Sequence, residues 1–162
     1  MDTKLSLLQT ILILLCAGAM AQENIDPSKF TGEKWFGLYL NKGKVGFMQQ
    51  VLSIGEGGRV FFTEEGTFRM NMSGVKQEMK VSSIRTYAHT GELVSIDYTL
   101  VDLLSTTEFH VQVEDNQLKL VKKMAGQSVE RYLPLPQEQL KDALKFQLWM
   151  AKKPKVGEEL IS

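Results

Sequence analysis

Residues 92–113, ELVSIDYTLVDLLSTTEFHVQV, contain two runs in which every second side chain is apolar. Successive side chains of a β-strand point to opposite faces, so this alternation predicts strands with one buried and one solvated face. A short segment that starts at Asp102 joins the two runs, which predicts a pair of neighbouring antiparallel strands. The apolar positions are Val94, Ile96, Tyr98 and Leu100 in the first run, and Phe109, Val111 and Val113 in the second.

The same period of two recurs on both sides of this stretch, and the breaks fall at the turn residues Gly, Asn and Asp. Gly66, inside a long segment, is a candidate bulge or bend. Sequential hairpins of this kind predict a mainly β protein, an antiparallel meander of about eight strands that forms a barrel-like or strongly curved sheet. The further segments are 35–40, 45–54, 59–72, 75–89, 117–124 and 127–133.

Near the C-terminus the apolar spacing becomes helical. The pattern predicts one helix over about 136–151 that packs on the sheet or plugs one mouth of a barrel. Pro136 suits the first turn of such a helix. Residues 154–162 then read as a turn and the beginning of a strand, so we expect either a short edge strand or a chain that continues beyond Ser162.

The first residues have the outline of a secretory signal peptide, with Lys4 before an apolar run and small residues at the end. The predicted signal is 1–21, with cleavage between Ala21 and Gln22 and a secreted or periplasmic product. A rival interpretation makes Cys16 a lipid attachment site, which would place the protein on a membrane surface. Residues 22–34 are predicted to be an extended leader before a single domain over 35–162.

Composition excludes several function classes. The formal net charge is zero, and the only basic cluster, Lys152 to Lys155, is short, so we expect no nucleic-acid partner. Cys16 is the only cysteine, and its loss with the signal would leave no thiol nucleophile and no disulfide.

No other constellation is typical of an enzyme or a cofactor site, so we expect neither catalysis nor a cofactor. Glu64 and Glu65 are neighbours on a strand and must point to opposite faces, so they cannot work as a catalytic pair. His89 lies beside a predicted turn. A zinc site is conceivable only if one strand face, with Glu108, His110, Gln112 and Glu114, lines a lumen rather than the solvated outside of a sheet.

Several methionine and phenylalanine side chains are either ordinary core or the lining of an adaptable apolar pocket. In the second case the protein is a lipocalin-like carrier of a small apolar ligand. The pocket candidates are Phe61, Met70, Met72, Met79 and Phe109.

The segment Trp35–Phe47, WFGLYLNKGKVGF, is the most distinctive motif of the chain. With Thr90–Leu93 and Pro134–Pro136, it resembles the β-rich N-terminal accessory domain of exported bacterial transglutaminase-like proteins, over about residues 33–162. In that family the catalytic Cys, His and Asp belong to a following domain. The resemblance implies an accessory or binding module without activity of its own, whose partner is a catalytic domain or an envelope protein.

Overall fold

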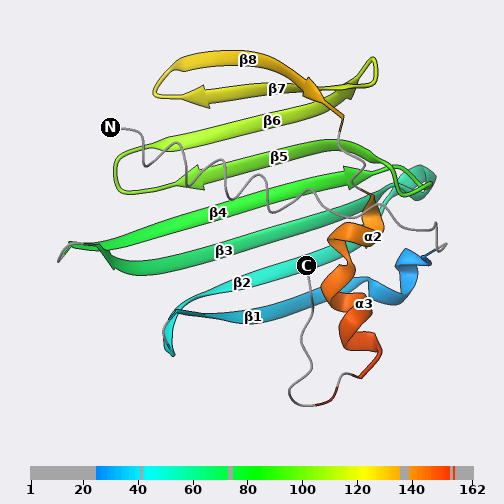
Figure 1. Ribbon diagram of the computed structural model, residues 1–162, viewed down its shortest axis with the longest axis horizontal. Coiled ribbons are helices and arrows are strands. Elements are labelled where there is room, and N and C mark those ends of the chain that lie inside the picture. The colour runs from blue at the N-terminus through cyan, green and yellow to red at the C-terminus, as the bar shows by residue number, and fades with distance from the viewer. Residues whose placement is uncertain (1–24, 41, 73–74, 136–138, 154, 156–162) are drawn as a thin grey trace.

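Eight antiparallel strands form one sheet in chain order, and two short helices lie on one of its faces (Figure 1). The structure is a computed structural model that describes residues 25–40, 42–72, 75–135, 139–153 and 155. The predicted signal peptide, Cys16, Ala21 and Gln22 lie outside the described residues. The strands are β1 Gly32–Leu40, β2 Gly43–Ile54, β3 Val60–Met72, β4 Val75–Tyr87, β5 Leu93–Val101, β6 Thr106–Glu114, β7 Gln117–Met124 and β8 Gln127–Pro134.

The mainly β meander predicted from the sequence is confirmed, and the sheet takes the curved form rather than that of a closed barrel. Each strand pairs with its neighbour in the chain, so β1 and β8 are the two edges of an open sheet. The turns fall where the sequence placed them. Asp115 and Asn116 have φ angles of 47° and 62°, and Ala125 and Gly126 have 50° and 77°, the left-handed pairs that two-residue hairpin turns require.

The segments at the two ends of the domain differ from expectation. Within the predicted extended leader 22–34, Pro27–Phe30 form the 3-10 helix η1, and β1 already begins at Gly32. The side chain of Asp26 explains the turn, because its carboxylate accepts hydrogen bonds from the backbone and hydroxyl of Ser28. These hydrogen bonds lower the pKa of Asp26.

The C-terminal helix is shorter than predicted and has two parts, α2 Leu140–Ala143 and α3 Lys145–Ala151. Residues 136–138 lie outside the described residues. Gln139 is extended and forms a β-bridge with Glu92, so the helix begins only after it. The backbone hydrogen bonds from Leu144 to Leu140 and from Leu148 to Leu144 continue across the division.

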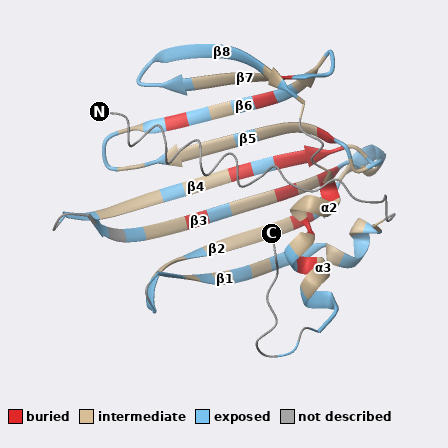
Figure 2. Cartoon of the chain, viewed as in Figure 1, coloured by how far each residue is buried: buried red, intermediate tan, exposed pale blue. Residues whose placement is uncertain are grey.

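The core lies at one end of the face that carries the helices, which we call the helix-bearing face (Figure 2). Register brings together Leu52 with Phe62, and Val60 with Tyr87. Leu140 and Leu144 cover these side chains from the helix. Tyr87 and Leu144 are fully buried. The core therefore joins the middle of the sheet to its C-terminal helix.

A bulge between β4 and β5 changes which residue of the first alternating run enters this core. Tyr87 pairs with Leu93 whereas Thr86 pairs with Ser95, so Val94 is the extra residue. Leu93 is consequently buried in the core and Val94 is not. The predicted face of Val94, Ile96, Tyr98 and Leu100 is thus interrupted at its first member.

Gly66 causes no bulge, which was one of the two alternatives expected for it. Gly66 stands opposite Met48 on β2 and opposite Val81 on β4, and neither strand pairing has a register shift. A glycine that is required lies on β2 instead: a Cβ atom on Gly46 would stand 1.9 Å from the carbonyl oxygen of Thr67. Only a residue without a side chain permits β2 and β3 to approach so closely there.

We expect Gly46→Ala to lower the free energy of unfolding by about 1–3 kcal/mol, because the added methyl group must push the β3 backbone away. Gly43→Ala on the same strand is the matched control, since its Cβ would meet its nearest atom, the carbonyl oxygen of Leu40, at 3.4 Å. Urea unfolding of both variants measures the difference. Equal stability of the two variants would contradict the proposed close approach.

Candidate functional site

A chain of polar side chains links α3 to three strands on the helix-bearing face. Gln147 Nε2 donates to Gln50 Oε1 at 2.7 Å, and Gln50 Nε2 donates to Glu64 Oε1 at 2.7 Å. The other carboxylate oxygen, Glu64 Oε2, lies 3.1 Å from the guanidinium nitrogen Nη2 of Arg85. Register produces this arrangement, because Gln50, Glu64 and Ser83 stand opposite one another on β2, β3 and β4.

This polar chain is largely shielded from water. The side chains of Arg85 and Glu64 are 11% and 17% exposed, and the guanidinium group of Arg85 lies 5.8 Å from the centre of the Phe62 ring. Within the described part of the protein, Arg85 Nε and Gln147 Oε1 have no hydrogen-bond partner. A shielded ion pair of this kind adds little net stability, but the loss of one member is costly.

The polar chain has the geometry of a structural connection between helix and sheet rather than that of a catalytic site. The carboxylate of Glu64 is engaged by Arg85 and Gln50, and Ser83 Oγ approaches it only to 3.4 Å. The sequence correctly placed Glu64 and Glu65 on opposite faces, since Glu65 is exposed. Sequence reasoning missed Gln50, Arg85 and Gln147, and the one available signal was the polar Gln147 within an apolar helical stripe.

The five pocket candidates are not brought together. Phe61 pairs with Thr86 on the face opposite to Phe62, which we call the open face. Met79 stands opposite Phe68 on the helix-bearing face, and the ring of Phe109 packs against Tyr98 on that face at 5.8 Å. Met70 and Met72 have register positions opposite Gln77 and Val75.

Met79 and Phe109 share a face but stand far apart. Ser83, the residue opposite Tyr98, lies four positions along β4 from Met79, about 13 Å in the strand direction. Burial raises the pKa of the Tyr98 phenol, which therefore stays neutral and suits an apolar surface. The five residues therefore do not form the predicted pocket. A carrier function stays a prediction, and these residues do not provide its binding site.

The strand face that was considered for zinc belongs to the open face of the sheet. His110 Nδ1 lies 2.6 Å from Asp97 Oδ1, and both side chains are about half exposed. Glu108 and Gln112 are exposed beside it, and His89 is exposed at its turn. Across the described residues, no three His, Cys, Asp or Glu side chains are grouped so that they could hold a metal ion.

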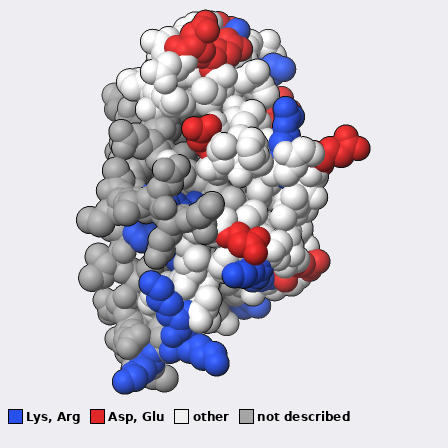
Figure 3. All heavy atoms as spheres, turned by 90° about the vertical axis from the view of Figure 1, so that its right-hand side faces the viewer, with Lys and Arg blue, Asp and Glu red and all other residues white. Residues whose placement is uncertain are grey.

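Charged side chains are unevenly placed on the side of the molecule that Figure 3 shows. Acidic groups gather at one end of that side and basic groups at the other, with scattered groups of both signs between them. Among the described helices, none is both long and apolar enough to cross a bilayer. The absence of a nucleic-acid partner stays a prediction.

Three aromatic side chains of the β1–β2 hairpin form an exposed group on the open face, which we call the hairpin aromatic surface: Trp35, Tyr39 and Phe47. They are 58%, 67% and 42% exposed. The rings of Trp35 and Phe47 are 5.7 Å apart, and the indole nitrogen of Trp35 donates to Glu33. Phe36 points the other way and packs edge-on against Phe146 of α3 at 5.5 Å.

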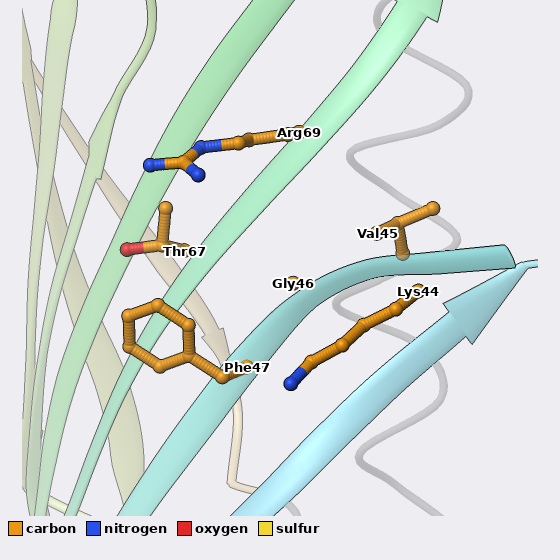
Figure 4. Close-up of a pocket in the computed structure, with 6 residues that line it drawn as sticks. All are labelled: Lys44, Val45, Gly46, Phe47, Thr67 and Arg69. Atoms are coloured by element: carbon orange, nitrogen blue, oxygen red, sulfur yellow. The ribbon is translucent and has the colours of Figure 1, made fainter.

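A depression of about 260 Å³ adjoins this surface. Thr67 lies there between the side chains of Arg69 and Phe47 (Figure 4). Arg69 donates to Glu78 at 2.8 Å, and this hydrogen bond lowers the pKa of Glu78. Lys44 has no hydrogen-bond or ion-pair partner among the described residues. The lining residues are Lys44, Val45, Gly46, Phe47, Thr67 and Arg69.

We expect Glu64→Gln to lower the free energy of unfolding by about 2–3 kcal/mol, because shielded Arg85 loses its counter-ion. The adjacent Glu65→Gln is the matched control and should change stability by less than about 0.5 kcal/mol, since Glu65 is exposed. Adding Arg85→Met to Glu64→Gln should recover much of the loss. Chemical denaturation checks all three, and equal effects at positions 64 and 65 would contradict the account.

Comparison of the chain with models of protein families, with curated proteins and with solved structures found no match. The likeness to the accessory domain of transglutaminase-like proteins therefore rests on the sequence motifs alone and stays a prediction. The geometry of the site, rather than a relative, has to support a function.

Proposed function

We propose that this chain is a non-catalytic binding module that docks a partner protein through its hairpin aromatic surface. The observation that carries the proposal is the exposure of Trp35, Tyr39 and Phe47 as one group beside a shallow depression. The partner that fits the sequence resemblance is a transglutaminase- or protease-like catalytic domain. The module is accessory to that domain.

The chemistry of the surface supports protein docking. Aromatic side chains bury much area at little entropic cost, and Trp and Tyr are enriched at the centres of protein interfaces. One aromatic residue of the hairpin, Phe36, is half-buried and packs against Phe146 of α3. Three others face solvent instead, next to Lys44, which has no ion-pair partner among the described residues and suits an acidic rim on the partner protein.

The polar groups support a module without chemistry of its own. Glu64, which supplies the carboxylate of the polar chain, interacts with Arg85 and Gln50 and is not free to act as a base. His110 lies beside Asp97 on the open face, and no Ser, Thr or Cys side chain among the described residues is hydrogen-bonded to it. The sole cysteine of the chain belongs to the predicted signal peptide.

Export completes the proposal. We expect the protein recovered from its natural compartment to begin at Gln22, because Ala19 and Ala21 suit a signal peptidase. Intact-mass measurement of the exported protein checks this. An N-terminal Cys16 that carries acyl chains would instead place the module on a membrane surface.

We expect the purified protein to bind a transglutaminase-like catalytic domain encoded in the same or a neighbouring reading frame. The double variant Trp35→Ala/Phe47→Ala removes two rings of the hairpin aromatic surface. It should weaken binding about a hundredfold, as the loss of two hot-spot residues does. Isothermal titration calorimetry measures the affinity. Turnover assays of the module alone should show no transglutaminase or protease activity.

Ile84→Ala is the matched control, because Ile84 lies on the same open face at an exposure close to that of Phe47. It should bind the catalytic domain as the unmodified protein does. Undiminished binding by the double variant would reject the hairpin aromatic surface as the docking site. Turnover by the module alone would reject the accessory role.

A further inference from the structure

The two edge strands of the sheet differ in where their charged residues lie. Edge strands expose unpaired backbone groups, and proteins protect them with charged side chains and proline. β8 carries Glu130 and Arg131 in its middle and Pro134 at its end. β1 carries its charged residues, Glu33 and Lys34, only near its start, and has neither charge nor proline from Trp35 to Leu40, the sequence WFGLYL. This uncharged part of the β1 edge is thus open to strand addition.

The geometry of β1 is suited to pairing. It is nine residues long and lies at the edge of the sheet, with β2 on its inner side (Figure 1). The β1–β2 ladder has a bulge, but Leu38 pairs with Gly46 and Tyr39 with Lys44, so the extra residue is Val45 on β2. The outer strand itself stays regular.

We propose that β1 pairs antiparallel with β1 of a second copy of this chain, with the two-fold axis at Gly37. The two sheets then join into one continuous sheet through their β1 edges, which carry no charge from Trp35 to Leu40. This inference goes beyond the proposed function and does not depend on it.

The sequence of β1 is self-complementary about Gly37. Residues opposite one another in an antiparallel pair share a face. One residue must therefore stand opposite its own copy, and the two-fold axis passes between these two copies. With Gly37 on the axis, Trp35 stands opposite Tyr39 of the second copy, and this aromatic pair forms twice. On the helix-bearing face Phe36 meets Leu38 of the second copy, and both are half-buried apolar residues.

Glycine at the axis is what leaves room for these rings. A Cβ atom on Gly37 would stand 2.9 Å from the ring of Tyr39, which covers Gly37 on the open face. An axis through Phe36 or Leu38 would instead place Trp35 or Tyr39 opposite Gly37 and leave no pair of exposed aromatic side chains. Among the three central registers, with the axis at Phe36, Gly37 or Leu38, only that of Gly37 joins the two hairpin aromatic surfaces.

Charge also favours a second copy as the occupant. The antiparallel arrangement places Glu33, on the open face at the start of β1, at the turn end of the partner hairpin, whose second strand carries Lys44. The formal net charge of the chain is zero, so two copies do not repel one another strongly.

Sedimentation velocity of the purified protein at about 1–100 μM should show a concentration-dependent dimer. Tyr39→Lys places on β1 the kind of charge that guards β8, and should raise the dimer dissociation constant at least about tenfold. Tyr132→Lys, at an exposed tyrosine of β8, is the matched control and should leave the dimer intact. Circular dichroism verifies that both variants are folded.

Hydrogen exchange of the unmodified protein gives a second readout that needs no variant. Amides of residues 33–40 should exchange more slowly at high than at low protein concentration, while those of 127–134 should not change. A monomer throughout the concentration range would overturn the proposal. So would a dimer that resists Tyr39→Lys, or one in which only β8 becomes protected. Because these measurements use the protein alone, their outcome is separate from binding of a catalytic domain.

Discussion

The burial of one face of the sheet under a short C-terminal helix is the interaction on which the rest of the structure depends. A meander of hairpins is not stable unless one face is covered, and here Leu140 and Leu144 cover Val60, Phe62 and Tyr87. Full burial of each such side chain contributes about 1.5–3 kcal/mol. The polar chain from Gln147 to Arg85 lies beside this cluster and connects α3 directly to β2, and through Gln50 and Glu64 to β3 and β4. Helix position and strand register are therefore coupled.

An open sheet covered in this way keeps two features that a closed barrel would lose. It has two edges, and among the described residues both α-helices, α2 and α3, lie on a single face. The chain places charged residues in the middle of β8 and leaves β1 without charge from Trp35 to Leu40. The β1–β2 hairpin directs Phe36 towards α3 and exposes Trp35, Tyr39 and Phe47 on the other face. Both proposals for binding rest on this hairpin, because it combines an unguarded edge with exposed aromatic area.

Much of the fold was predictable because strands and turns are encoded locally. All eight strands were expected within about three residues of their observed ends, since the alternation and the turn residues lie within each segment. The site was much less predictable. Glu64 and Arg85 are 21 positions apart in the sequence, and nothing in the local pattern of either indicates an ion pair. The pocket candidates were chosen by residue type, and the register then placed Phe61 and Met79 on opposite faces.

The sequence by itself determined the number of strands, their sequential pairing and the positions of the hairpin turns, because these follow from a period of two and from residues that accept left-handed backbone angles. Only the tertiary structure decided which residues are buried. The bulge at Val94 directs Leu93 into the core, and Gln147 meets Gln50 across 97 residues of chain. Such contacts depend on how curvature and register bring distant segments together, and a local pattern of side chains carries no information about that distance.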